Sequence, residues 1–518
     1  MYFAKEGSDV KFFKKFFNQV FFIALAFLLQ FLLILAVVSY FNQYYIVFQV
    51  LQSLLGIAVF VYIINKKESP EFKLPWLFLF MAFPVFGLAV YLLLADQRLS
   101  GKQNKRLVKA EDACKLYLVA PEKERKEMNV RLGAYAGTDN YLARAARTEG
   151  DIYNKVDFFP VGEAFFADLL TELRKAEKFI FMEYFIIDPG KMWNAVHEIL
   201  LEKVKAGVEV RVIYDDIGTL GMVGGNFAKT LCKEGIRCVK FNPFRPLVSG
   251  IYNNRDHRKI TVVDGKVGYT GGVNLGDEYI NENKRLGHWK DTAVKIRGAA
   301  AGTLTAMFLQ MFDMTTRETS DYGKYLDVAH EKFDEPGCVH PFGDGPQPFY
   351  GEQVGENNYI NIIAAAKDYV WITTPYLIPD HNLTTALRNA ALRGVDVRIV
   401  TPHIPDKKII LNMTRSNYTY LLQAGVKIYE YTPGFIHAKQ MLSDDKVAFV
   451  GTINMDYRSL VHHYECGALL VDVPCLKDIR EDFESTLAVS EEITPYNFKM
   501  GFFASLFNSF LTLFAPLF

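Results

Sequence analysis

The chain opens with long uncharged stretches that predict membrane-embedded helices. Residues Phe16 to Asn65 carry no charge, and only the polar and aromatic stretch Ser39 to Tyr45 interrupts them. A transmembrane helix needs about 20 apolar residues, so this run predicts two spans that meet near Asn42. A further uncharged run, Leu74 to Ala95, is also long enough to cross, but Pro84 within it permits a kinked or re-entrant segment instead.

Lysine and arginine residues flank this region in three groups, within residues 5–15, 66–73 and 98–109. Such residues favour the cytoplasmic side of a membrane. All three groups can be cytoplasmic if the first two segments form a hairpin and the third is re-entrant or interfacial. We therefore expect a multi-pass plasma-membrane protein whose remaining domains face the cytoplasm. Three full crossings would break this rule somewhere and stay an open alternative.

The last residues, Met500 to Phe518, are also uncharged but are patterned differently. Polar side chains recur there at helical spacing and leave a narrow polar stripe on an otherwise apolar helix. Such a helix can lie in the membrane surface, and the alternative is a terminal helix packed on the protein's own core. The stripe consists of Ser505, Asn508, Ser509 and Thr512.

Between these apolar ends the chain alternates short apolar runs with amphipathic stretches, and it does so twice. Strand-like runs at Lys178 to Ile187 and at Tyr369 to Tyr376 are each followed by a helical stretch and a second strand-like run. The turns before the second runs also match, Ala206-Gly-Val-Glu-Val-Arg211 against Arg393-Gly-Val-Asp-Val-Arg398. Strands that alternate with helices in this way predict βαβ units and a parallel or mixed sheet. The predicted fold class is α/β, with two domains related by duplication.

At 518 residues the chain is too long for one ordinary core. A typical size of about 100 to 200 residues per domain predicts roughly three units. We expect a membrane region with two or three hydrophobic helices, a polar connector, two α/β domains and an apolar amphipathic tail. Their expected bounds are 1–96, 97–150, 151–330, 331–490 and 491–518, respectively.

The most informative pattern occurs once in each α/β domain. It consists of a histidine, a lysine two residues on and an aspartate five residues after the lysine, followed by a Gly-x-x-Asn. Because side chains alternate along a strand, the histidine and the lysine share one face. If the domains pair about a pseudo-two-fold axis, both sets converge on one site. The sets are His257, Lys259, Asp264 and Asn274, and His437, Lys439, Asp444 and Asn454.

Composition narrows the classes of partner. Lys plus Arg and Asp plus Glu both number 58, so the formal net charge is zero, and we expect no nucleic-acid partner. The six cysteines form no C-x-x-C pair, so we expect reduced thiols and no metal.

His462 and His463 lack a second ligand cluster at metal spacing and are expected to be a structural pair. Arg255 and Arg258 are expected to face lipid headgroups or to form surface ion pairs.

The doubled residue set suits chemistry on a phosphodiester. Such an anion repels nucleophiles, so a site must neutralise its oxygens while it holds a nucleophile in line with the leaving group. The lysines and asparagines can neutralise and hold the phosphate, one imidazole can attack phosphorus, and the other can protonate the departing alkoxide. A carboxylate at the far ring nitrogen would fix the tautomer of each imidazole. Asp291 and Glu465, in comparable segments after the two motifs, are the candidates, and surface ion pairing is the alternative.

The doubled motif resembles that of the phospholipase D superfamily, and the chain is similar to bacterial cardiolipin synthases in its motif flanks and membrane part. The residues that carry this similarity are Asn254 to Lys259, Asn454 to Ser459, and Ser69-Pro70 leading into Trp76. The resemblance implies two phospholipase-D-like α/β domains with mixed sheets. It also implies transfer of a phosphatidyl group from one phosphatidylglycerol to another, giving cardiolipin and glycerol through a phosphohistidine. It implies no metal or other cofactor.

By the same resemblance, His257 is expected to be the nucleophile and His437 the general acid and then the base, although the symmetric motifs allow the reverse. Asp264 and Asp444 are expected to hold the turn of the motif and a neighbouring cation rather than to touch substrate. Three alternatives stay open: a membrane phospholipase D that uses water, transfer from another donor lipid, and a non-catalytic lipid-binding protein. The sequence does not decide whether the chain forms a homo-oligomer.

Overall fold

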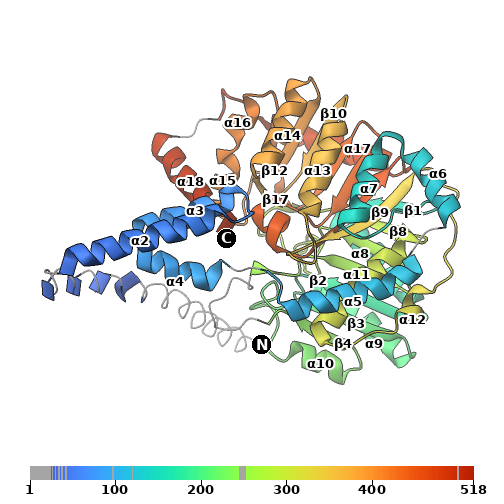
Figure 1. Ribbon diagram of the computed structural model, residues 1–518. Helices are drawn as coiled ribbons and strands as arrows, with labels where there is room; N and C mark the ends of the chain where they lie inside the picture. Colours follow the sequence, from blue (N-terminus) through green and yellow to red (C-terminus); the bar gives the residue numbers. More distant parts are fainter. Residues whose placement is uncertain are drawn as a thin grey trace. The chain divides into compact units, whose positions relative to one another are not determined.

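The computed structural model contains two compact units, which are described separately (Figure 1). The structure describes residues 44–95, 98–118, 121–243, 253–498 and 501–517, with scattered positions between 25 and 40. The apolar unit comprises Met1–Arg98, Phe244–Asn253 and Leu506–Phe518. The larger unit comprises Leu99–Pro243 and Asn254–Ser505.

The larger unit contains two mixed sheets with the same order of strands. The first sheet runs β1 (Lys155–Phe159), β8 (Ala293–Arg297), β6 (Val267–Gly271), β5 (Lys259–Val263), β2 (Phe179–Tyr184), β3 (Glu209–Asp215), β4 (Arg237–Phe241). The second runs β9 (Cys338–Asp344), β18 (Glu465–Val471), β16 (Val447–Gly451), β15 (Gln440–Ser443), β10 (Tyr369–Thr373), β12 (Asp396–Pro402), β13 (Lys427–Tyr431), β19 (Ser490–Ile493).

Strand directions match between the two sheets as well. β2, β3 and β4 are parallel, as are β10, β12 and β13, and the other neighbours are antiparallel. The sheets therefore correspond strand by strand, except for β19 at the edge of the second. This arrangement confirms the predicted α/β fold with two duplicated halves. Below, the first half is the part from β1 to α11 (Ala300–Thr316), and the second half is the part from β9 to β19.

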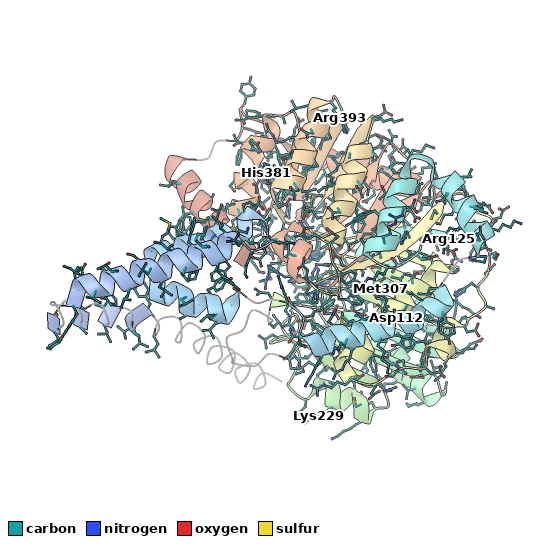
Figure 2. All side chains as sticks on the ribbon, in the orientation of Figure 1. Asp112, Arg125, Lys229, Met307, His381 and Arg393 are labelled. Carbon is teal, nitrogen blue, oxygen red and sulfur yellow. The ribbon has the colours of Figure 1, made fainter. Side chains whose placement is uncertain are left out.

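Both faces of the first sheet are covered, so every residue of its inner strand β2 is buried, and all but Glu183 are apolar or aromatic. Alternate residues of β2 point to opposite faces. Ile180 and Met182 pack in one core with α8 (Gly162–Lys175) and α9 (Lys191–Lys205). Phe179 and Phe181 pack in another core with α11, which continues into the second half. Figure 2 shows Met307 of α11 in the interior and Arg125, Lys229 and Arg393 at the periphery.

The segment expected to be a polar connector is largely helical and belongs to this second core. Its helices are α5 (Gly101–Leu118), α6 (Glu122–Leu132) and α7 (Ala136–Ala145). Leu107, Ala110 and Cys114 of α5 recur at helical spacing and are buried in the core that contains α11. The remaining helices are α10 (Phe227–Lys233), α12 (Tyr322–Leu326), α13 (Val354–Ala365), α14 (His381–Leu392), α15 (Lys408–Ser416), α16 (Tyr418–Leu422) and α17 (Leu476–Ala488).

In the apolar unit, α2 (Tyr45–Ile64) is the one helix among the described residues that is long and apolar enough to cross a membrane. It matches the second predicted span, whereas the first span lies mostly outside the described residues. The third run forms α3 (Pro70–Ala82) and α4 (Pro84–Leu94), which are separated at Phe83. The rings of Trp76 and Phe80 both contact Tyr91, so α4 folds back on α3 as a hairpin.

The C-terminal helix α18 (Phe502–Phe514) ends in the apolar unit, where Phe510 and Phe514 contact the ring of Phe78 on α3. Its polar and apolar positions are reversed relative to a water-soluble surface helix. Asn508 of the predicted polar stripe is 4% exposed, whereas Phe507 and Leu506 are 58% and 60% exposed. An apolar outer surface of this kind suits a lipid environment better than water.

Candidate active site

The backbone of each half holds the histidine of the other half. The main-chain N–H of His257 donates to the carbonyl oxygen of Tyr464 at 2.9 Å, and that of His437 donates to the carbonyl oxygen of Lys290 at 2.7 Å. The second contact extends a short parallel pairing of β14 (Gly434–Ile436) with β7 (His288–Lys290). Each histidine is therefore fixed beside the residue that precedes a carboxylate of the opposite half.

The two carboxylates cross over in the same way. Nδ1 of His257 donates to Glu465 at 2.9 Å, and Nδ1 of His437 donates to Asp291 at 2.6 Å. Both carboxylates are fully buried, which rules out the alternative of surface ion pairing. A hydrogen bond at Nδ1 leaves Nε2 of each neutral imidazole as the free lone pair. The structure thus brings Asp291 and Glu465 to the histidines, each to the one in the other motif.

Glu465 has two further hydrogen bonds that sequence reasoning missed. The hydroxyl of Ser459 donates to Oε1 at 2.6 Å, and the hydroxyl of Thr452 donates to Oε2. Both residues lie in segments that the sequence singles out, Thr452 within the Gly-x-x-Asn pattern and Ser459 at the end of the flank that follows it. Spacing alone could not show that their hydroxyls point to a carboxylate.

The lysines of both halves lie beneath the histidines and are almost fully buried. Nζ of Lys259 donates to the carbonyl oxygen of His257 at 2.5 Å, and Nζ of Lys439 donates to that of His437. Burial lowers the pKa of Lys259 to about 8 and that of Lys439 to about 7. Both lysines therefore lose their charge near neutral pH when the site is empty. A bound anion would stabilise their charged form.

Burial and the neighbouring cations also keep the imidazoles neutral. Burial, followed by the charges of Lys259 and Lys439, holds the pKa of His257 well below its usual range. Burial and Lys439 lower the pKa of His437 to about 4, against the opposing effect of Asp291. That His257 responds to a lysine of the second motif shows that the two motifs form one electrostatic site.

The two asparagines differ in their surroundings. The side-chain oxygen of Asn274 accepts from the N–H of Ile186 at 3.0 Å, and its amide donates to the hydroxyl of Tyr279 at 2.7 Å. Asn454 is 5% exposed, and its side-chain oxygen has no hydrogen-bond partner among the described residues. Asn274 is thus already engaged within its own half, whereas Asn454 has an unused acceptor at the site.

Asp264 and Asp444 fix the hairpin of each motif to the start of the central strand. Asp264 accepts from the backbone N–H groups of residues 177–179 at 2.7 to 2.8 Å. Asp444 accepts in the same way from residues 367–369 at 2.8 to 2.9 Å. Their partners are backbone amides rather than the cation expected from the sequence. Both aspartates have a φ of 53°, a left-handed conformation that Asp tolerates better than most residues.

Arg255 and Arg258 are buried instead of facing headgroups or solvent, so that expectation was wrong. Nε of Arg255 donates to Asp215 at 2.9 Å. Arg258 donates to the carbonyl oxygen of Glu465 at 3.2 Å and to the hydroxyl of Tyr350 at 3.1 Å. Arg258 therefore joins the halves directly behind the site, a role that its position in the motif flank could not reveal.

Aromatic rings line both histidines, and here the halves differ. The residue two positions before each carboxylate packs against the imidazole of a motif: Trp289 against His437 and His463 against His257. The ring centroids are 5.4 and 5.5 Å apart, with interplanar angles of 48° and 45°. Equivalent positions thus hold an indole in one half and an imidazole in the other.

Comparisons with known proteins agree with this geometry. A family model described as "Cardiolipin synthase, PLD-like domain" matches residues 169–310 and 359–487. An uncharacterised Streptococcus mutans protein is 44% identical, covering 84% of this chain and 94% of its own length. A cardiolipin synthase of Alkalihalophilus pseudofirmus is 34% identical, covering 91% and 93%. The solved phosphatidylserine synthase of Haemophilus influenzae shares the fold, with a TM-score of 0.53, 13% identity and coverage of 70% and 93%. The chain belongs to the cardiolipin synthase family of phospholipase-D-like proteins.

Proposed function

We propose that the protein transfers a phosphatidyl group from one phosphatidylglycerol to the hydroxyl of a second, giving cardiolipin and glycerol. The observation that supports this proposal most directly is the crossed pair of hydrogen bonds, from His257 to Glu465 and from His437 to Asp291. It leaves two Nε2 atoms of one electrostatic site available for opposite roles, one as nucleophile and one as proton carrier. Membership of the cardiolipin synthase family supports the choice of substrate.

In the first step, Nε2 of His257 attacks phosphorus and the bond from phosphorus to the glycerol oxygen breaks. For this step His437 must first take up a proton on Nε2 as the anionic substrate binds, because the phosphate and Asp291 stabilise its imidazolium form; it then gives that proton to the departing oxygen, so glycerol leaves as a neutral alcohol. The product is a phosphatidyl group bound covalently to His257. In the second step, the hydroxyl of another phosphatidylglycerol gives its proton to His437 while its oxygen attacks phosphorus. His257 is released, and cardiolipin forms.

The protein groups around the phosphate support these steps in distinct ways. Lys259 and Lys439 neutralise the phosphate oxygens, and the anion in turn keeps both lysines protonated. Asp291 stabilises the imidazolium form of His437, while Glu465 holds His257 with its proton on Nδ1. Asn454 borders the phosphate position directly. Asn274 acts there through Tyr279, whose ring contacts His437.

The apolar unit supports a lipid acceptor rather than water. We assign α2 and the preceding uncharged run to a membrane hairpin, the α3 and α4 hairpin to a re-entrant segment, and α18 to the membrane interface. The larger unit would then face the cytoplasm of a bacterial cell. A membrane anchor of this kind keeps the enzyme among lipid acceptors, which favours transfer to a second phosphatidylglycerol over hydrolysis by water.

The test is product analysis with purified full-length protein in mixed micelles that contain phosphatidylglycerol as the sole phospholipid. We expect cardiolipin and glycerol in equal amounts, and no turnover by His257→Ala. Phosphatidic acid and glycerol without cardiolipin would overturn the proposal in favour of a phospholipase. Addition of phosphatidylethanolamine or a nucleotide-activated lipid tests the donor, because a preferred donor would suppress glycerol release and raise cardiolipin formation.

A further inference from the structure

His463 is a second imidazole beside His257 that the proposed transfer does not use. It is 8% exposed, and neither of its ring nitrogens has a hydrogen-bond partner among the described residues. Its Nδ1 lies 3.6 Å from Oε1 of Glu465, which is too long for a hydrogen bond. A buried polar ring without partners is costly, so this ring has unused binding capacity that points at Glu465.

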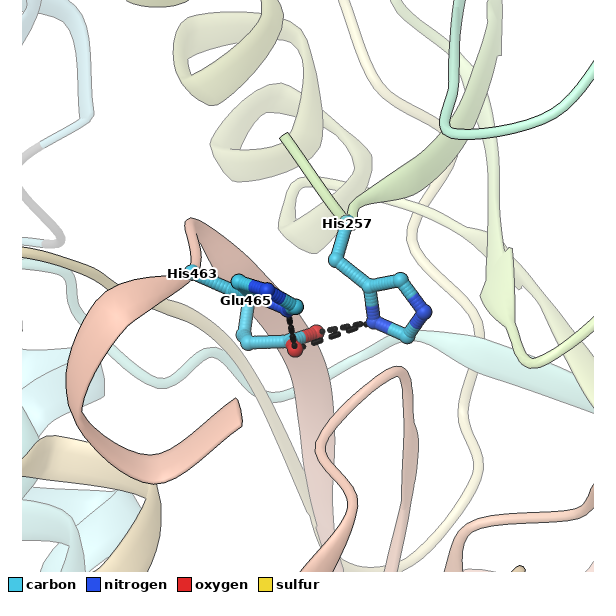
Figure 3. Close-up of side chains that lie close together, drawn as sticks. All are labelled: His257, His463 and Glu465. Atoms are coloured by element: carbon cyan, nitrogen blue, oxygen red, sulfur yellow. Dashed lines mark hydrogen bonds and ion pairs between the residues drawn. The ribbon is translucent and has the colours of Figure 1, made fainter. Parts of the chain in front are cut away.

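The Glu465 carboxylate lies between the imidazoles of His257 and His463 (Figure 3). One ligand atom from each of the three residues can be chosen so that all lie within 4.8 Å of one another. Ligand atoms around a tetrahedral zinc ion lie about 3.4 Å apart, given metal to ligand distances of about 2.1 Å. The separations of 2.9 Å from His257 and 3.6 Å from His463 to Glu465 bracket this value.

We propose that His257, His463 and Glu465 form an inhibitory site for Zn²⁺ or a similar transition-metal ion. Two imidazoles and one carboxylate are ligands that Zn²⁺ accepts readily. Glu465 is already fixed as an anion acceptor by the hydroxyls of Ser459 and Thr452. The adjacent cations Lys259 and Lys439 oppose a bound cation, so we expect binding in the micromolar range rather than tighter.

Metal binding at this place would block the nucleophile by a tautomer change. In the metal-free site the single ring proton of neutral His257 is on Nδ1, where it bonds to Glu465. When the lone pair of Nδ1 binds the ion, that proton moves to Nε2. The ring stays neutral, but Nε2 no longer has a free lone pair with which to attack phosphorus.

The other half cannot form the same site. The position equivalent to His463 holds Trp289, whose indole N–H can donate a hydrogen bond but cannot bind a metal. Asp291 and His437 therefore offer only two ligands there. This difference predicts one such ion per chain, bound on the His257 side.

The direct test is zinc binding by detergent-solubilised, chelator-treated full-length protein, measured by equilibrium dialysis. We expect the wild-type chain to bind one more zinc ion than His463→Asn, and the neighbouring control His462→Asn to bind as the wild type does. Equal zinc binding by all three would mean an adventitious ion only and would overturn the site. X-ray absorption of the zinc-loaded wild type gives a readout that needs no variant: two imidazoles and a carboxylate are expected, and one imidazole would contradict the site.

Inhibition, unlike binding, rests on the proposed function. Each variant is compared with its own zinc-free rate, so that loss of basal activity does not confuse the result. We expect zinc to inhibit the wild type reversibly, and His463→Asn to need at least about ten times more zinc, because loss of even an outer-shell partner of a metal ligand costs about that much affinity. Zinc binding without any effect on transfer would retain the site but refute its inhibitory role, and absence of transfer in zinc-free wild type would instead count against the proposed function.

Discussion

Nδ1 of His257 lies 2.9 Å from the carboxylate of Glu465, which is 208 residues further along the chain. His437 and Asp291 repeat this relationship with the halves exchanged, across 146 residues. Neither half can therefore orient its own histidine. Duplication has produced one site whose parts are interlocked, and substitutions in one half should affect the histidine of the other.

The two hydrogen bonds between histidine and carboxylate predict which steps slow down when each carboxylate is replaced. Glu465→Gln should slow formation of the phosphatidyl-enzyme, because it disturbs the tautomer of His257. Asp291→Asn disturbs the proton carrier His437, which acts in both steps, so it should slow both the formation of this intermediate with its glycerol release and the attack of the acceptor. We expect a loss in kcat of about 100-fold or more for each, by analogy with other carboxylate and histidine pairs. Rapid-quench kinetics would separate the steps.

Glu282 is an exposed carboxylate in an ion pair with Lys191, so Glu282→Gln is the matched control and should leave both steps unchanged. An effect of Glu465→Gln confined to acceptor attack, with formation of the phosphatidyl-enzyme unchanged, would contradict the crossed assignment.

The buried lysines predict an alkaline limb in the pH dependence. With the pKa of Lys439 at about 7 and that of Lys259 at about 8, the free enzyme loses its phosphate-binding charge as the pH rises through this range. Burial and the two lysines hold the pKa of His257 well below its usual range, so this nucleophile is neutral at neutral pH and adds no acid limb there. The measurement is kcat/KM against pH with phosphatidylglycerol.

Lys439→Arg serves as the comparison, because arginine keeps its charge to a pKa above about 12. Its residual activity should show the alkaline limb at higher pH than the wild type. A flat kcat/KM from about pH 6 to about pH 9 in the wild type would rule out this role of the lysines.

The hydrogen bonds of the hairpin aspartates predict that replacing either aspartate mainly destabilises the fold, because neither is expected to touch substrate. Asp264→Asn keeps the left-handed backbone but replaces a charged acceptor of three backbone N–H groups. We expect it to lower the free energy of unfolding by about 2 kcal/mol, as for hydrogen bonds to a charged group. Denaturant unfolding measures this change. The neighbouring turn residue Lys266→Gln is the control, and an unchanged stability of Asp264→Asn would contradict a structural role.

Topology can be tested through a natural cysteine. Cys232 on α10 is exposed in the larger unit, whereas the other five cysteines are buried. A cytoplasmic catalytic unit predicts that a membrane-impermeant maleimide labels Cys232 only after spheroplasts are lysed. Cys232→Ser should abolish this labelling. Labelling of intact spheroplasts would place the catalytic unit on the outer side.

Much of the fold follows from the sequence because the duplication is visible in it. The strands around Phe179 and Tyr369, the helices after them and the hairpin that turns at Asp264 follow from apolar patterning and turn residues. The helices within residues 97–150 are harder to predict. Their many charged residues obscure the apolar pattern of Leu107, Ala110 and Cys114, which are buried at helical spacing. Charge on an exposed face does not exclude a helix that is buried on the other.

The site could be predicted only as far as its residue types. The histidines, lysines and both carboxylates were identified from the sequence, but the crossing of His257 to Glu465 depends on how the halves dock, which spacing does not encode. The burial of Arg258 and the position of His463 depend on the same docking. Residues that act across an interface between halves give no periodic signal in either half.

The most direct test of the central claim is to trap the covalent intermediate. His437→Ala lacks the acid of the first step and the base of the second, so with phosphatidylglycerol it should form the adduct slowly and then retain the phosphatidyl group, because no base activates the acceptor. The adduct is sensitive to acid, so the peptides are prepared at alkaline pH. Mass spectrometry should locate the phosphatidyl group on the peptide that contains His257, and the His257→Ala protein should carry none. An adduct on His437 in the His257→Ala protein, or transfer to cardiolipin without an adduct on either histidine, would contradict the account.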